Sequence, residues 1–175
     1  MNEDQTPVTR YLKESGIPHR FFRHPGQVRS LEQAAQERGQ KPDQVIRSIL
    51  FRLPKDEYVM VLMAGPRQIS WQLLRRYLGK SRVTMASEQE VLEVTGYPLG
   101  AVSPFGLPKP IRILVDTSLT DQDEISIGSG QRFSTVILSR QDLFRALGEV
   151  ETGEFGEHLL NNYRTTRTVT PCPDT

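Results

Sequence analysis

The sequence predicts one α+β domain in which helices pack against a mixed central β-sheet. The chain has 175 residues, of which 37% are hydrophobic and 25% charged, and this suits a single domain with its own core. Apolar stretches typical of strands alternate irregularly with stretches typical of helices, and hairpin-like turns join several of them. The sequence has no regular βαβ rhythm, no GxGxxG motif and no P-loop, which argues against a dinucleotide-binding fold.

Helix and strand patterns alternate in the N-terminal half. Helices are expected over 7–15, from Ser30 to Gly39 and from Ser70 to Gly79, and strands at Phe21–Phe22, Val45–Phe51, Tyr58–Met63 and Arg82–Met85. Ser30 and Gln33 have the spacing of a capping box, and glycine at the far end of a helix is a common stop signal. The β-branched, apolar run that begins at Val45 indicates a buried strand.

The C-terminal half is expected to contain two helices, three strands and a tail. The helices begin after Ser87 and after Ser139, and the strands cover Ile111–Asp116, Glu124–Gly128 and Phe133–Leu138. Hydrophobic residues become sparse from Glu149 onward. We therefore place the domain at residues 1–148, able to fold without the remainder, and interpret residues 149–175 as a frayed or appended extension.

The longest predicted loop runs from Thr95 to Pro108 and holds three glycines and three prolines. Glycine permits backbone angles and close approaches that a Cβ forbids, while proline fixes φ. A loop this long and this stiff is either a rigid surface connection or a functional loop.

Composition excludes several classes of protein. No apolar run is long enough to span a membrane, so no membrane contact is expected. The polar N-terminus is unlike a secretory signal, and the single Cys172 leaves no disulfide framework or cysteine metal site within one chain. A reducing cytoplasm fits best. The net charge is +1, with a mild positive bias in residues 1–148 that is compatible with contact to a phosphate backbone.

Four segments together resemble one known family. They are Val45–Leu50, Met85–Ser87, Thr95-Gly96-Tyr97 with Gly100–Pro104, and Ile127–Arg132. This set is similar to the YbaK/ProX family of aminoacyl-tRNA deacylases, the domain type that is also inserted in bacterial prolyl-tRNA synthetases. The resemblance covers roughly residues 17–148, and its most specific element is the TGY…GxxxP loop.

The resemblance implies a single mixed-sheet α+β domain that acts on aminoacyl-tRNA. Family members hydrolyse, in trans, the ester that joins a wrong amino acid to the 3′ adenosine of tRNA. The implied substrate carries a small amino acid such as alanine, serine or cysteine, and the implied partners are aminoacyl-tRNA and an aminoacyl-tRNA synthetase. No metal or organic cofactor is associated with the family. Water attack helped by the substrate's ribose hydroxyl fits a sequence without a GxSxG motif.

The resemblance also assigns residues to the site. The catalytic set is Arg47, Gly100, Ala101, Val102, Ser103 and Pro104. The substrate-binding set takes His24, Gly128, Ser129 and Gly130 from the resemblance. It adds Tyr97 as the aromatic residue of the loop and Asp116 as a carboxylate at a strand end that could bind a hydroxyl. Backbone N–H groups of the glycine-containing loop would orient the ester carbonyl and stabilise its developing charge, and Tyr97 would stack on the terminal adenine. For the serines, Asp116 and His24, a structural hydrogen bond remains the alternative.

Arg47 departs from the family pattern, which has a lysine in its V-x-K-[ST] strand. Arginine remains protonated and presents a planar fork suited to phosphate or carboxylate. Three functions therefore stay open: a trans-editing deacylase, a module that binds tRNA ends or nucleotides without hydrolysis, and a protein that docks on a synthetase.

A separate basic run offers a contact for the acceptor stem of tRNA. Its members are Arg75, Arg76, Lys80 and Arg82. Such a run is either a solvated helix end or a phosphate-contacting patch.

Overall fold

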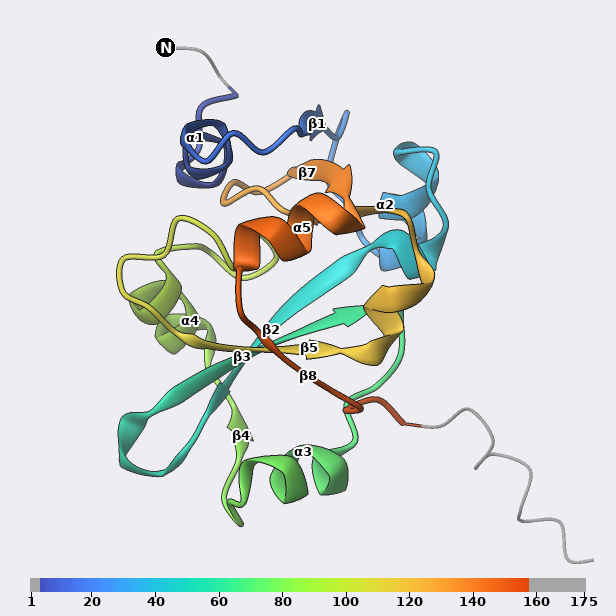
Figure 1. The fold of residues 1–175 in the computed structure, drawn as a ribbon. Coiled ribbons are helices and arrows are strands. Elements are labelled where there is room, and N and C mark those ends of the chain that lie inside the picture. Colours follow the sequence, from blue (N-terminus) through green and yellow to red (C-terminus); the bar gives the residue numbers. More distant parts are fainter. Residues whose placement is uncertain (1–3, 158–175) are drawn as a thin grey trace, which may run out of the picture.

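The computed structural model describes residues 4–157, which form two β-sheets and five α-helices (Figure 1). The larger sheet has the order β4-β2-β3-β5-β8. Its strands are β2 (Ile46–Arg52), β3 (Tyr58–Ala64), β4 (Thr84–Met85), β5 (Arg112–Asp116) and β8 (Glu151–Gly153). Strand β2 pairs antiparallel with β3 and β4, whereas β3–β5 and β5–β8 are parallel. The predicted α+β domain with a mixed central sheet is therefore confirmed.

A second, antiparallel sheet has the order β1-β7-β6. It consists of β1 (Arg20–Arg23), β6 (Glu124–Gly128) and β7 (Ser134–Ser139). An isolated bridge between Val45 and Ser126 joins it to the start of β2. The bridge places the start of β2 beside the middle of β6.

The helices begin and end close to where the sequence predicts. They are α1 (Pro7–Glu14), α2 (Leu31–Glu37), α3 (Trp71–Leu78), α4 (Glu88–Thr95) and α5 (Arg140–Leu147). The side chains of Ser30, Ser70, Ser87 and Ser139 each accept a hydrogen bond from the third backbone N–H of the following helix. These N-caps satisfy donors that have no partner inside the helix.

The five-stranded sheet separates two apolar clusters, because successive side chains of a strand point to opposite faces. On one face, residues such as Leu50 and Leu62 pack with Ile127 and Val136 of the smaller sheet. On the other face, the cluster is formed by Phe51, Val59, Val61, Met63, Leu74, Leu78 and Phe155. Figure 1 shows α3 on this second side, with α1, α2 and α5 on the first.

The domain continues past residue 148, where the sequence analysis ends it. Strand β8 pairs with β5, and Phe155 is fully buried in the cluster beneath α3. The Phe155 N–H donates to Oδ2 of Asp116 at 2.7 Å. A three-residue polar strand carries no apolar pattern of its own, so only pairing with β5 identifies it. Residues 158–175, including Cys172, lie outside the described part of the chain.

No helix within residues 4–157 is long and apolar enough to cross a membrane.

Candidate functional site

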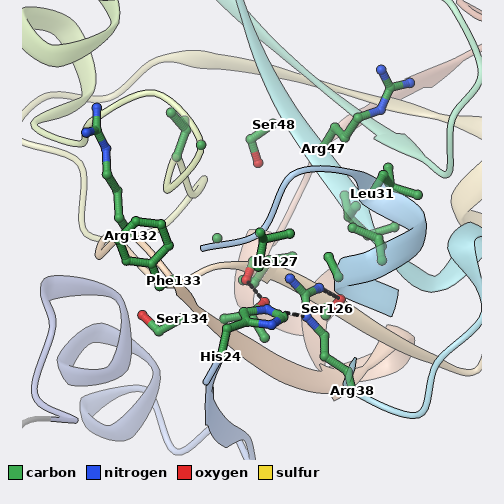
Figure 2. Close-up of a pocket in the computed structure, with 18 of the residues that line it drawn as sticks. His24, Leu31, Arg38, Arg47, Ser48, Ser126, Ile127, Arg132, Phe133 and Ser134 are labelled. Carbon is green, nitrogen blue, oxygen red and sulfur yellow. Dashed lines mark hydrogen bonds between the residues drawn. The ribbon is translucent and has the colours of Figure 1, made fainter. Parts of the chain in front are cut away.

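A cavity of about 570 Å³ opens at the junction of the two sheets, bounded by α2, β2, the loop after α4 and the turn between β6 and β7 (Figure 2). The loop contributes Leu99, Gly100 and Val102 to its walls, and β6 contributes Ser126 and Gly128. The two segments that the resemblance singles out, GxxxP and GSG, thus meet at one cavity.

The loop and β6 approach each other backbone to backbone. A Cβ on Gly128 would lie 2.1 Å from the carbonyl oxygen of Val102, so only glycine fits there. The Gly130 N–H donates to the Ala101 carbonyl at 2.9 Å. Gly100 has a φ of +90°, a conformation that favours glycine. These contacts hold the loop rigidly against the cavity.

Two backbone N–H groups of the loop are available to a ligand. The Ala101 N–H is used within the loop, since it donates to the Pro98 carbonyl at 3.0 Å. The N–H groups of Gly100 and Val102 donate to no residue in the described part of the chain. Both residues line the cavity, and free donors of this kind can stabilise negative charge on a carbonyl oxygen.

Tyr97 shapes the loop from within and does not line the cavity. Its side chain is 2% exposed, and its hydroxyl donates to the Phe105 carbonyl at 2.6 Å. Burial raises the pKa of Tyr97 to about 12. Its ring also packs on Gly130, where a Cβ would lie 2.7 Å from the ring. The expectation that Tyr97 stacks on the terminal adenine is therefore wrong, because the ring is enclosed in the core.

His24 belongs to a buried polar network on the opposite wall. Its Nδ1 contacts the Glu37 carboxylate, and its Nε2 lies 3.1 Å from Nε of Arg38 (Figure 2). The Arg38 Nη1 donates to Ser126 Oγ at 2.7 Å. Because Arg38 can only donate, Nε2 accepts this hydrogen bond, and Nδ1 donates to Glu37. Both ring nitrogens are engaged, so His24 positions Arg38 and has no lone pair left to act as a base.

Two charged groups in this network have shifted pKa values. The hydrogen bond from His24, followed by that from Gln33, holds the pKa of Glu37 below its usual range. Burial lowers the pKa of Arg38 to about 10, so Arg38 remains a cation at neutral pH. No carboxylate lies within 4.0 Å of its guanidinium in the described part of the chain. Glu37 lies beyond this distance but still attracts Arg38 electrostatically. The Arg38 charge is therefore only partly compensated, which favours an electron-rich ligand in the cavity.

Arg47 borders the cavity but directs its guanidinium elsewhere. Arg47 pairs with Met63, a member of the cluster beneath α3, whereas Ser48 pairs with Leu62 of the opposite cluster. Cross-strand neighbours share a face of the sheet, and the Arg47 guanidinium donates to the Arg67 carbonyl. Figure 2 shows it pointing away from His24 and Ser126. Burial lowers the pKa of Arg47.

Ser48 is the polar side chain that β2 directs toward the cavity. Its Oγ is buried and has no hydrogen-bond partner among the described residues. A buried hydroxyl without a partner is unfavourable unless a ligand or water satisfies it. Ser48 thus joins the two loop N–H groups as a contact available to a bound molecule.

Three predicted site residues form structural hydrogen bonds and do not line the cavity themselves. Ser129 Oγ lies 2.7 Å from Ser134 Oγ, and Ser103 Oγ accepts from the Phe105 N–H at 3.3 Å. Asp116 accepts from the N–H groups of Ser118 and Phe155. All three are fully buried. Neither they nor Ala101, Pro104 or Gly130 line the cavity, so their direct contact with a substrate is not supported, and the structural alternative holds for Ser103, Ser129 and Asp116.

The basic run near α3 is exposed but distant from the cavity. Arg75, Arg76, Lys80 and Arg82 are all exposed. They belong to α3 or follow it, on the face of the large sheet opposite the cavity (Figure 1). Their predicted contact with an acceptor stem therefore does not form part of this site.

The cavity walls carry positive charge only. Its lining within residues 4–157 includes Arg29, Arg38, Arg47 and Arg132 and no aspartate or glutamate. Sequence analysis did not select Arg29, Arg38 or Arg132 as site residues. The sequence did contain a signal for Arg38. Residues three or four positions apart share a face of a helix, and Arg38 follows the buried Ala34 by four residues and the buried Ala35 by three. Elsewhere in this range, no group of three or more His, Cys, Asp or Glu side chains could hold a metal ion.

Comparisons with known proteins identify the family of this chain. Residues 25–146 match the aminoacyl-tRNA editing domain, and the chain therefore belongs to that family. The resemblance to YbaK/ProX proteins is confirmed.

Two curated relatives illustrate the family's two settings. The proline–tRNA ligase of Thermosipho melanesiensis is 31% identical over 105 residues, which cover 60% of this chain and 18% of the ligase. The uncharacterized protein YwhH of Bacillus subtilis is 32% identical over 114 residues, which cover 65% of this chain and 72% of YwhH. The chain thus spans only about a fifth of the ligase, as an inserted domain would, but most of the small protein.

Solved structures share the fold. A candidate trans-editing enzyme for prolyl-tRNA synthetase superposes with a TM-score of 0.81 at 23% identity, covering 90% of this chain and 99% of that one. A hypothetical protein, APE2540, superposes with a TM-score of 0.78 at 25% identity, covering 87% of this chain and all of that one.

Proposed function

We propose that this protein hydrolyses the ester bond of mischarged aminoacyl-tRNA that carries a small amino acid of the alanine, serine or cysteine type. The observation that carries the proposal is the cavity itself, whose lining within residues 4–157 includes Arg29, Arg38 and Arg132, no acids, and two loop residues with free N–H groups, Gly100 and Val102. Positive charge attracts the phosphates of a tRNA end, and the free donors suit an ester carbonyl.

In this proposal the ester carbonyl faces the N–H groups of Gly100 and Val102. As water attacks, negative charge develops on the carbonyl oxygen and is stabilised by these preorganised donors. No protein side chain in the cavity is free to act as a base, because both nitrogens of His24 are engaged. The ribose hydroxyl next to the ester therefore assists the water, and Arg38 and Ser48 hold the surrounding polar groups of the substrate.

The side chain of the amino acid would contact apolar parts of the wall, including Val102 and Ile127. A methylene or hydroxyl difference in such a pocket is worth only about 1–3 kcal/mol. We therefore expect graded rather than absolute preference among the small amino acids. Action in trans would take place in the cytoplasm, on tRNA released by a synthetase or held by one.

A second function is favoured by one observation. The Arg47 guanidinium points away from the cavity, so the position of the family's lysine supplies no cation to the ligand. If that lysine is required for hydrolysis, the protein binds tRNA ends without cleaving the ester.

Single-turnover deacylation of tRNAs charged with Ala, Ser, Cys or Pro separates the two functions. The wild type should hydrolyse at least one of the first three faster than spontaneous hydrolysis. Gly100→Ala should slow the reaction, because φ at this position is +90° and the new Cβ strains the loop that carries the donors.

Gly148→Ala is the matched control, since Gly148 also has a positive φ of 71° and open space around it but lies after α5. Both variants should lose similar stability in urea, and only Gly100→Ala should lose activity. Tight binding of uncharged tRNA with no hydrolysis of any charged tRNA would overturn the deacylase and favour the binding module.

A further inference from the structure

One aromatic side chain stands at the mouth of the cavity in an unfavourable conformation. Phe133 lines the cavity, is 48% exposed and has a φ of +62°. Positive φ is rare for a bulky residue and marks local strain. The other non-glycine residues with positive φ in the described chain are Lys55 and Asp56, both polar and both in the turn between β2 and β3. Phe133 thus combines backbone strain with exposed apolar surface, two features that do not stabilise the fold.

The surrounding contacts fix Phe133 in this position. Its carbonyl accepts a hydrogen bond from the His24 N–H at 2.8 Å. This bond extends the β1–β7 pairing by one residue, since Arg23 and Ser134 are the last pair of the two strands. The backbone is therefore held by the sheet, and the ring is presented to the cavity mouth. Strain of this kind persists where the neighbouring structure determines the conformation, and it is concentrated at ligand sites.

The neighbours of Phe133 suit a nucleotide. Arg132 stands beside it on the side of the cavity away from Arg38 (Figure 2), with a side chain that is 54% exposed. Its ion pair with Glu88 is long, at 3.4 Å, and exposed, so it exchanges readily with a phosphate. Leu99, from the loop on the other wall, is 55% exposed and adds a second apolar side chain to the lining.

We propose that Phe133 is the stacking platform for the terminal adenine of the substrate, with Arg132 next to the adjoining phosphate. This inference rests on the proposed function, since it places the 3′ nucleoside of the same substrate. Bases that leave a helical stack are commonly bound on the faces of aromatic side chains. Phe133 takes the role that the sequence assigns to Tyr97, whose ring is enclosed in the core.

The test uses an uncharged oligonucleotide with a CCA end in which the last base is 2-aminopurine, whose fluorescence falls when it stacks. The wild type and Phe133→Trp should bind it and quench the fluorescence. Phe133→Ala and Phe133→Leu should bind about tenfold more weakly and quench little, since leucine retains apolar surface but offers no aromatic face. Leu92→Ala, which removes a side chain that is 52% exposed on α4, should behave as the wild type.

Phe133→Gly guards against loss of folding, because glycine adopts positive φ without strain. Phe133→Gly should be at least as stable in urea as Phe133→Ala, and it should bind the oligonucleotide as weakly as Phe133→Ala does. In deacylation of charged tRNA, Phe133→Ala and Phe133→Gly should each raise KM about tenfold and change kcat less, since the adenine base is remote from the ester.

The possible failures of the two proposals are distinguishable. Equal affinity and equal quenching by wild type and Phe133→Ala would overturn the stacking platform, even if charged tRNA is hydrolysed. Quenching that depends on Phe133 in a protein that hydrolyses no charged tRNA would support the platform and overturn the deacylase.

Discussion

Two cavities of this protein differ in the charge of their walls. The cavity beside the glycine-containing loop measures about 570 Å³ and is lined by four arginines and no acids. A second cavity, beside the start of α3, is larger at about 860 Å³, and its charged lining residues within 4–157 are Asp43, Asp121, Glu157 and Arg67. A phosphate-bearing ligand is attracted to the first cavity and repelled by the second. Wall charge therefore favours the first cavity as the candidate site, whereas size would select the other one.

Strand β2 directs neighbouring side chains to opposite faces of the large sheet. Arg47 and Ser48 are neighbours in sequence, but their side chains leave opposite faces of the sheet. The Arg47 guanidinium is held by Arg67, a residue that lines the second cavity, while Ser48 faces the first. Arg38, which follows the last turn of α2, is one of the cations that line the first cavity. The two faces of the large sheet should thus respond differently to mutation, one in stability and the other in activity.

The largest effect is expected on the face without the proposed site. Phe155→Ala should lower the free energy of unfolding by about 3–5 kcal/mol, because Phe155 is fully buried beneath α3 and packs at 5.0 Å against the Tyr77 ring. Urea denaturation measures the loss. Deacylation under conditions where the variant is folded should change little, and a selective loss of activity would contradict the separation of the two faces.

Deletion of residues 149–175 should destabilise the protein at least as much, since it removes β8 together with Phe155. If a chain that ends at residue 148 were as stable as the wild type, the domain boundary predicted from the sequence would be correct.

An intermediate effect is expected from the two arginines. Arg38→Gln should lower kcat/KM by about tenfold or more, because it removes a charged donor from the cavity and leaves His24 and Ser126 without their shared partner. Arg47→Gln should lower kcat/KM by about twofold or less at the same fraction of folded protein.

Arg38→Lys sharpens the comparison, since lysine keeps the charge but cannot bridge His24 and Ser126. If Arg38→Lys is more active than Arg38→Gln, the positive charge itself contributes to activity. If the two variants are equally impaired, the hydrogen bonds of the guanidinium to His24 and Ser126 are what matters. A greater loss of kcat/KM in Arg47→Gln than in Arg38→Gln would overturn our assignment of the cation.

The smallest effect concerns pH and tests the network around His24. The pKa of Glu37 is lowered below 4.5, chiefly by the hydrogen bond from His24. A carboxyl whose pKa is lower in the folded than in the unfolded state stabilises the fold above the unfolded pKa, and that stabilisation is lost as the pH falls through the folded pKa. Wild type should therefore lose more stability on acidification below pH 4.5 than Glu37→Gln, as measured by urea denaturation at each pH. Parallel stability profiles would contradict the lowered pKa of Glu37.

Local features of the fold were predictable from sequence because their signals are local. The serine N-caps and the glycines after α3 and α4 mark helix ends with side chains only a few residues away. The apolar runs that became β2 and β3 needed no distant partner to be recognised. Strand β8 lacked such a run and was missed.

The candidate site was predictable only in part. The GxxxP and GSG segments correctly indicated the loop and the strand that face each other, and Gly128 shows why glycine is needed there. The roles of Tyr97 and Arg47 were wrong or unsupported, because composition does not reveal whether a ring is enclosed or to which face of a sheet a side chain points.

The sequence by itself determined the α+β class, most element boundaries and membership of the editing family, since these depend on local propensity, periodicity and short motifs. The tertiary structure alone decided which residues share the cavity. Arg38, Ser48 and Phe133 belong to three separate elements and become neighbours of the loop only when the two sheets pack. Packing also directed Arg47 to the opposite face of the large sheet and enclosed Tyr97, because strand register and burial are fixed by contacts between segments far apart in the chain.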